Sequence, residues 1–202
     1  MKNNKGFSLI EIMAVIIIIG VMLTIAVPAV SSSIKDSRLH SYYVTINSFL
    51  DTVRGEYESK KYGPYLADDE IMMVPLAAVE LDEGNEEESP FGKYELDRSY
   101  FIIARNNYGF NIYTYVIDSN NYGIFNVRSD QLSKDDVIQN KLNEYANVRD
   151  YFECTTDGFV TLPGSFMFMG KSYIGEEAIS TKRKDNMCEV KEYPVIVFEL
   201  ED

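Results

Sequence analysis

Histidine, tryptophan and cysteine are scarce in this sequence, which has one histidine, two cysteines and no tryptophan. A catalytic triad or a histidine-based metal cluster needs partner groups that His40 alone does not provide. The sequence also contains no phosphate-binding glycine loop and no paired-cysteine metal motif. We therefore interpret His40 as a residue on a helix surface. We expect no catalytic residues, no metal site, no cofactor and no enzymatic activity.

Basic residues are also few, with 19 Lys and Arg against 32 Asp and Glu, a net charge of -13 and a pI near 4.5. Such a chain repels nucleic acid at long range, so no nucleic acid partner is expected. Lys182, Arg183 and Lys184 form a local basic patch that could touch DNA or glycans. Because the rest of the chain is acidic, a solvated loop is the favoured interpretation of this patch.

The N-terminal segment carries the strongest signal in the sequence. Residues 1–6 are basic through Lys2 and Lys5, and residues 7–30 are apolar except for one charge, Glu11. A helix over 7–30 would be about 36 Å long, enough to cross a hydrocarbon core of about 30 Å. Because the positive flank comes first, we expect the N-terminus to stay cytoplasmic and the rest of the chain to lie outside.

Two simpler interpretations account for less of this segment. An ordinary signal peptide has an apolar region of only about 7–15 residues that ends at a small-residue cleavage site. The apolar run here is longer and ends at no clear site of that kind. A plain signal anchor fits the length but does not account for Glu11, since a carboxylate in a membrane helix costs about 2.5–3.5 kcal/mol. Glu11 therefore needs a partner.

The run Gly6-Phe7-Ser8-Leu9-Ile10-Glu11 resembles the processing motif of type IV prepilins and type II secretion pseudopilins. The resemblance covers residues 1 to about 55. It implies that a prepilin peptidase cuts between Gly6 and Phe7 and methylates the new N-terminus. It also implies that Glu11 pairs with the N-terminal amine of a neighbouring subunit. Pro28 lies where family members often carry a proline that loosens the helix for assembly.

Pro28 would remove one backbone hydrogen bond and kink or loosen the helix. A second, amphipathic helical half follows, and its apolar positions recur at steps of mostly three and four. These positions are Ile34, Leu39, Tyr42, Tyr43, Ile46, Phe49, Leu50, Val53 and Tyr57. We therefore predict one continuous helix from Phe7 to about Lys60. The chain divides into a leader (1–6), a membrane and filament-core helix (7–30), an amphipathic helix half (31–62) and a globular head (63–202).

The head is expected to be an antiparallel sheet of four or five strands, which gives an α+β fold. The clearest β region is 98–129, where Asn/Gly turns at 106–109 and 120–123 separate β-rich runs. In residues 110–117, one set of alternating side chains would cover the helix and the other would display Tyr113 and Tyr115. Further strands are predicted at 158–162, 165–169 and 194–200.

Two other segments of the head give weaker signals. Ser133 and Asp136 resemble a helix N-terminus, so a short amphipathic helix is predicted over about 137–148. Acidic runs at 68–70 and 82–88 flank an apolar segment at 71–79. The acidic runs could bind calcium, but no EF-hand spacing is present and a solvated loop is favoured.

The two cysteines, Cys154 and Cys188, both lie in the last quarter of the chain. Such a pair indicates one disulfide in an extracellular chain and two thiols in a cytosolic one. The pilin resemblance favours the bridge, because a late disulfide often closes a C-terminal region in that family. Some members from Gram-positive bacteria lack it, so two free thiols stay an alternative.

Together these patterns and the resemblance predict a structural subunit of a type IV pilus, either major or minor. Its partners would be other pilin subunits, the prepilin peptidase, the membrane before assembly, and a host-surface or cell-surface ligand of the head. The family implies adhesion, twitching motility or biofilm formation. Two alternatives stay open: a pseudopilin of a type II secretion system, and a membrane-anchored binding protein that never polymerises.

Overall fold

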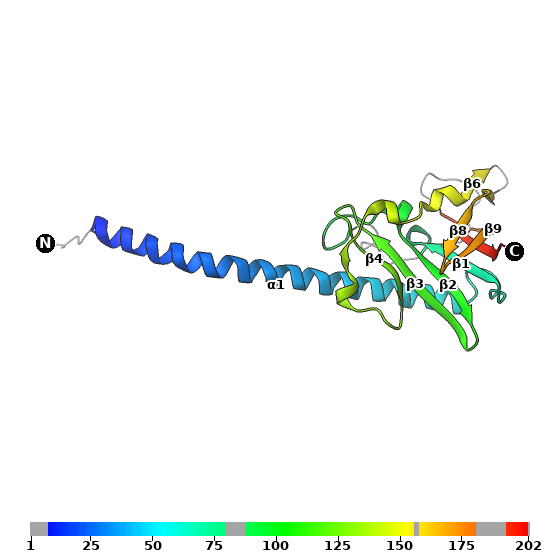
Figure 1. Cartoon of the computed structure of the whole chain (residues 1–202), viewed down its shortest axis with the longest axis horizontal. Coiled ribbons are helices and arrows are strands. Elements are labelled where there is room, and N and C mark those ends of the chain that lie inside the picture. The colour runs from blue at the N-terminus through cyan, green and yellow to red at the C-terminus, as the bar shows by residue number, and fades with distance from the viewer. Residues whose placement is uncertain (1–7, 80–87, 156–157, 181–192, 202) are drawn as a thin grey trace.

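The computed structural model describes residues 8–79, 88–155, 158–180 and 193–201. Its dominant feature is one long helix, α1 (Leu9–Glu58), which projects far beyond the head (Figure 1). Ser8 caps its N-terminus and Ser59 its C-terminus, and the helix runs without interruption through Pro28. The continuous helix predicted from Phe7 to about Lys60 is confirmed over these residues, while Phe7 itself lies outside the described part.

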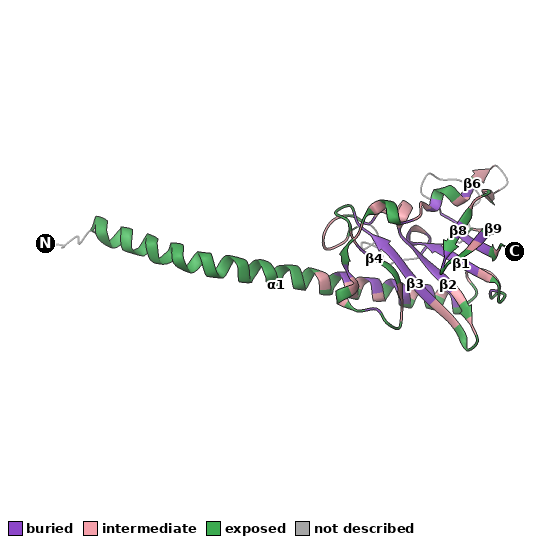
Figure 2. Cartoon of the chain, in the orientation of Figure 1, coloured by how far each residue is buried: buried purple, intermediate pink, exposed green. Residues whose placement is uncertain are grey.

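The two halves of α1 have different surroundings (Figure 2). The first half is exposed all round, and burial begins only where the helix enters the head. Most of the predicted apolar stripe is buried there, although Ile34 at its start stays half-exposed. The fully buried members of the stripe are Tyr42, Ile46, Phe49, Leu50, Val53 and Tyr57. The second half of the helix is therefore part of the hydrophobic core of the head.

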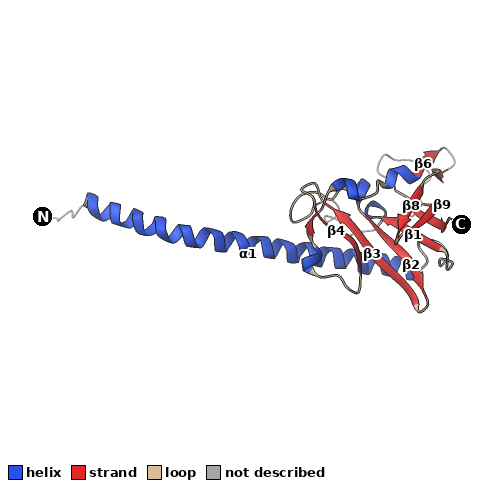
Figure 3. Cartoon of the chain, in the orientation of Figure 1, coloured by secondary structure: helices blue, strands red, loops and turns tan. Residues whose placement is uncertain are grey.

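The head contains one eight-stranded antiparallel sheet in the order β5-β4-β3-β2-β1-β10-β9-β8. Figure 3 draws the strands of the head in red. A separate hairpin is formed by β6 and β7. The strands are β1 (Glu70–Pro75), β2 (Tyr100–Asn106), β3 (Gly109–Ile117), β4 (Tyr122–Arg128), β5 (Ile138–Gln139), β6 (Phe152–Thr155), β7 (Gly158–Thr161), β8 (Ser165–Phe168), β9 (Lys171–Ile179) and β10 (Val195–Leu200). The short 3-10 helices are η1 (Leu76–Ala78), η2 (Leu96–Arg98), η3 (Lys134–Asp136), η4 (Leu142–Glu144) and η5 (Val148–Tyr151).

The predicted meander is confirmed as β2, β3 and β4, and the strands predicted in the tail correspond to β7, β8 and β10. The prediction of four or five strands was wrong, because the sheet has eight. The strand β1, which pairs with both β2 and β10, lies mostly in the apolar segment at 71–79, where no strand is predicted from the sequence. Its last five residues are all buried, so they show none of the alternation that marks a half-exposed strand.

The expectation that the second face of the sheet displays tyrosines to solvent was also wrong. Tyr113 and Tyr115 are only 7% and 5% exposed. Tyr115 stacks on Tyr100 with ring centroids 4.9 Å apart, and Tyr113 meets the edge of Phe168 at 5.1 Å. The Ala146 N–H donates to the Tyr100 hydroxyl, and the Tyr145 ring meets the edge of Phe125, so the segment that follows β4 covers part of this face. Because α1 packs on the other face, the central strands β2 and β3 are largely buried on both sides.

The prediction of a helix over about 137–148 was also wrong. Ser133 and Asp136 do form a capping box, but the helix they cap is the three-residue η3. The chain then turns into β5, where Ile138 and Gln139 pair with the edge of β4. Tertiary interactions override the helical pattern of this segment. They are the backbone pairing with the sheet edge and the burial of Tyr145, which is 2% exposed.

Candidate functional site: the exposed helix and its N-terminus

The exposed half of α1 presents an unusually large apolar surface. Its large apolar side chains between Leu9 and Val30 range from 48% exposed at Ile12 to 77% at Leu9. A soluble monomer rarely exposes a contiguous apolar patch of more than a few hundred Å². By length and composition this helix could cross a membrane. Lipid or the apolar surfaces of other chains must therefore cover it.

Glu11 lies at the tip of this surface, in the first turn of α1, where it forms a capping box with Ser8. The Ser8 backbone N–H donates to Oε2 of Glu11 at 2.8 Å and the Ser8 hydroxyl donates to the same atom at 2.9 Å. The Glu11 backbone N–H in turn donates to Oγ of Ser8 at 3.3 Å. The carboxylate of Glu11 therefore has hydrogen-bond partners in its own chain.

The sequence interpretation missed this role of Ser8, although a serine followed three residues later by a glutamate is a recognised signal for a capping box. The capping box satisfies hydrogen bonds, but Ser8 brings no positive charge. Among the residues that the structure describes, no Lys, Arg or His lies within ion-pair distance of Glu11. In the isolated chain its negative charge is thus uncompensated by any described residue, at the end of an apolar helix.

The remaining predicted site residues are only partly described. Gly6 and Phe7 lie outside the described residues, so cleavage between them stays a prediction. Pro28 lies inside α1 and is exposed on the projecting half. The assembly role expected for Pro28 also stays a prediction.

Cys154 lies in β6, opposite Phe159 of β7, whereas Cys188 lies outside the described residues. The disulfide between them therefore stays a prediction. We expect the oxidised protein to migrate faster than the reduced protein on a denaturing gel. A bridge across this loop should also add about 3–4 kcal/mol to the unfolding free energy. Equal mobility with and without reductant would contradict the bridge.

The structure places His40 but describes the charged runs of the head only in part. His40 is exposed on α1, and its ring lies 6.2 Å from that of Tyr43. Within the described ranges no group of three His, Cys, Asp or Glu side chains could hold a metal ion. Most of the acidic run at 82–88 and the basic patch at 182–184 lie outside those ranges, so their predicted surface roles are untested.

Comparison with known proteins agrees with the geometry of the N-terminus. Residues 1–27 match the family model of the prokaryotic N-terminal methylation motif. No solved structure matches the chain significantly. The match spans the basic leader, the Gly6-Phe7 junction, Glu11 and most of the exposed apolar helix. The N-terminal segment of this chain therefore carries a type IV prepilin-like methylation motif, which supports a relationship to the type IV pilins and pseudopilins.

Proposed function

We propose that this chain is a structural subunit of a type IV pilus and not an enzyme. Its precursor is anchored in the cytoplasmic membrane by the exposed half of α1, with the N-terminus cytoplasmic and the head outside. After cleavage before Phe7, the same apolar helix half leaves the lipid and packs against those of other subunits. The head is then displayed outside the cell, where it serves adhesion, motility or biofilm formation through a host-surface or cell-surface ligand.

The observation that carries this proposal is the carboxylate of Glu11, which no described residue neutralises, on the exposed apolar half of α1. In a membrane the charge is unfavourable by about 2.5–3.5 kcal/mol. Beside the N-terminal amine of a neighbour, about 4 Å away, the attraction is about 4 kcal/mol at an effective dielectric near 20. The two energies are of similar size, so pairing offsets the cost of the charge and favours the filament over the bilayer.

A type II secretion pseudopilin is the second candidate, because the N-terminal motif is shared between the two classes. It would form a short periplasmic filament by the same helix packing. Long fibres on the cell surface would favour the pilus. A membrane-anchored binding protein that never polymerises would retain its leader and would not depend on Glu11.

The proposal predicts which residue is the first of the mature chain and how its amine is modified. Mass spectrometry of the chain purified from its own cells should find Phe7 as the first residue, with one methyl group on its amine. A Gly6→Glu variant should retain residues 1–6, since the peptidase would no longer recognise the junction. An intact Met1 in the wild-type chain would contradict the proposal and favour the anchored binding protein.

A further inference from the structure

A groove lies where the exposed part of α1 meets the head. It has a volume of about 530 Å³ and is lined by Ser31, Ile34, Lys35, Arg38, Phe91, Asn120, Tyr122 and Gln139. Lys35 and Arg38 are both exposed, and neither is ion-paired within the described part of the chain. The neighbouring acid, Asp36, is already paired with Lys134 at 2.8 Å. The groove thus carries two positively charged side chains on a chain whose net charge is negative.

An acidic patch occupies another part of the head, across the adjacent strands β1, β10 and β9. It comprises Asp69, Glu70, Glu176, Glu177 and Glu199. Glu70 and Glu199 are direct partners in the antiparallel register, an arrangement that destabilises a sheet when the charges are alike. Partial burial and the four neighbouring carboxylates raise the pKa of Glu176.

Within the described part of the chain, none of these carboxylates is neutralised by an ion pair of its own. Asp68 beside the patch pairs with Arg105 at 3.1 Å, but the five patch residues have no ion pair among the described residues. No described group could hold a metal ion there either. The patch therefore costs stability in the isolated chain and retains its charge for an external partner.

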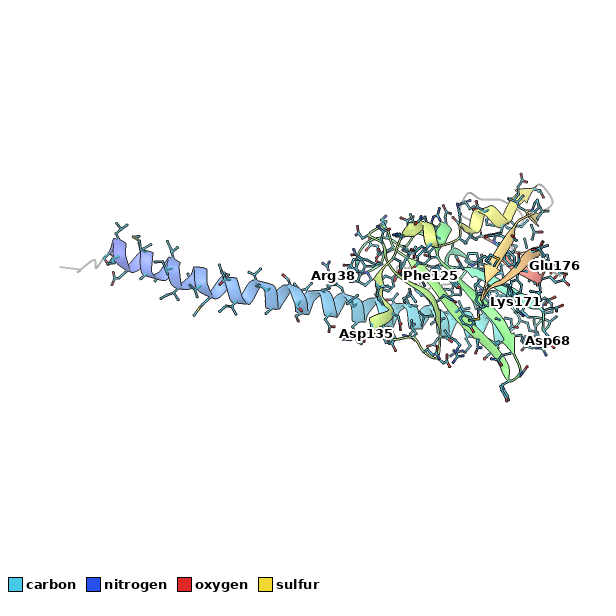
Figure 4. The ribbon with its side chains drawn as sticks, in the orientation of Figure 1. Arg38, Asp68, Phe125, Asp135, Lys171 and Glu176 are labelled. Carbon is cyan, nitrogen blue, oxygen red and sulfur yellow. The ribbon has the colours of Figure 1, made fainter. Side chains whose placement is uncertain are left out.

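The groove and the patch lie at opposite ends of the head along the direction of α1. Figure 4 shows Arg38 at the end from which the bare helix projects, and Glu176 at the far end together with Asp68. If two copies are displaced along the helix direction with their helices parallel, the acidic patch of one faces the end of the next that carries Lys35 and Arg38. A contact between two different surfaces of the same chain propagates into an open helical filament when it does not close into a ring.

We propose that the acidic patch of one copy docks against Lys35 and Arg38 in the groove of the next copy. This inference rests on the proposed polymerisation and adds a head-to-tail contact to the helix packing. The opposite charges of the patch and the groove steer association, and a wrong register is disfavoured because it brings like charges together. The contact thus fixes the axial order of the heads.

Cross-linking of intact fibres tests the contact. Because Arg38 and Glu176 lie far apart within one copy, a bond between residues at these positions can form only between copies. Fibres of the double variant Arg38→Cys, Glu176→Cys should give a ladder of dimers, trimers and larger species after mild oxidation, visible on a non-reducing denaturing gel. Each single cysteine variant is the control and should give no ladder. Fibres that assemble fully but yield only the control pattern would overturn the inference.

A charge exchange gives a second, independent test. Arg38→Glu should lower the yield of sheared fibres about tenfold or more, because it places like charges in the contact. Adding Glu176→Lys and Glu199→Lys should restore much of that yield. The control is Arg54→Glu, on an exposed site of α1 outside the groove, which should assemble normally. Wild-type yield from Arg38→Glu would refute the head-to-tail contact but not polymerisation, whereas a wild-type chain without fibres would refute the proposed function itself.

Discussion

Replacing Glu11 with Gln is expected to leave processing intact and to lower the yield of extracellular fibres about tenfold or more. A glutamine keeps a side-chain oxygen that can accept the hydrogen bonds from Ser8, so the capping box can persist. Only the negative charge is lost, and with it an attraction of about 4 kcal/mol to a neighbouring amine. Since about 1.4 kcal/mol is a factor of ten in an equilibrium constant, a large part of assembly should disappear. Fibres sheared from cells and quantified against total protein measure the effect.

Ser8→Ala is the matched control, because it removes the capping hydroxyl and keeps the charge. Losing the cap should cost about 1 kcal/mol in the first turn of the helix and leave fibre yield much closer to wild type. The N-terminus of both variants is determined by mass spectrometry, so that a failure of cleavage is not mistaken for a failure of assembly. If Ser8→Ala lost its fibres while Glu11→Gln kept them, Glu11 would act as a helix cap and not as a charge.

The second large effect is expected at the junction of α1 and the head. Ile46 is 0% exposed in the middle of the buried stripe, so Ile46→Ala leaves a cavity under the sheet. The unfolding free energy of the head should fall by about 2–5 kcal/mol. Urea unfolding of the full chain in detergent micelles, followed by tyrosine fluorescence, measures this loss. The absence of tryptophan leaves the tyrosine signal clear.

Val44 provides the comparison for Ile46, because it lies on the same helix and is 51% exposed. Val44→Ala should change the unfolding free energy by no more than about 0.5 kcal/mol. Equal losses for the two variants would mean that α1 does not contribute one buried face to the core of the head.

Local periodicity made the helix and the meander predictable from sequence. The stripe from Tyr42 to Tyr57 recurs at helical steps, and the two Asn/Gly turns sit between runs that favour strands. The strand β9 was missed because its glycine and glutamates are unfavourable in strands, and it is held there by pairing with β10 and β8. That pairing joins distant parts of the chain, which no local pattern reveals.

Of the residues proposed to act in assembly, some could be found from the sequence and others could not. Glu11 could be found from sequence, because one carboxylate in a long apolar run is conspicuous and its distance from Gly6 matches the prepilin motif. The acidic patch could not be found from the sequence, because Glu70 and Glu199 become neighbours only when β1 pairs with β10. Likewise, Lys35 and Tyr122 line one groove only because β4 lies beside α1.

The central claim is that a neighbouring subunit neutralises Glu11, and the structure of purified wild-type fibres tests this most directly. The account predicts that the carboxylate of every Glu11 lies within about 4 Å of the N-terminal amine of an adjacent subunit, inside a core of packed helices. Fibres in which that carboxylate faces solvent or lipid, with no cationic group nearby, would contradict it.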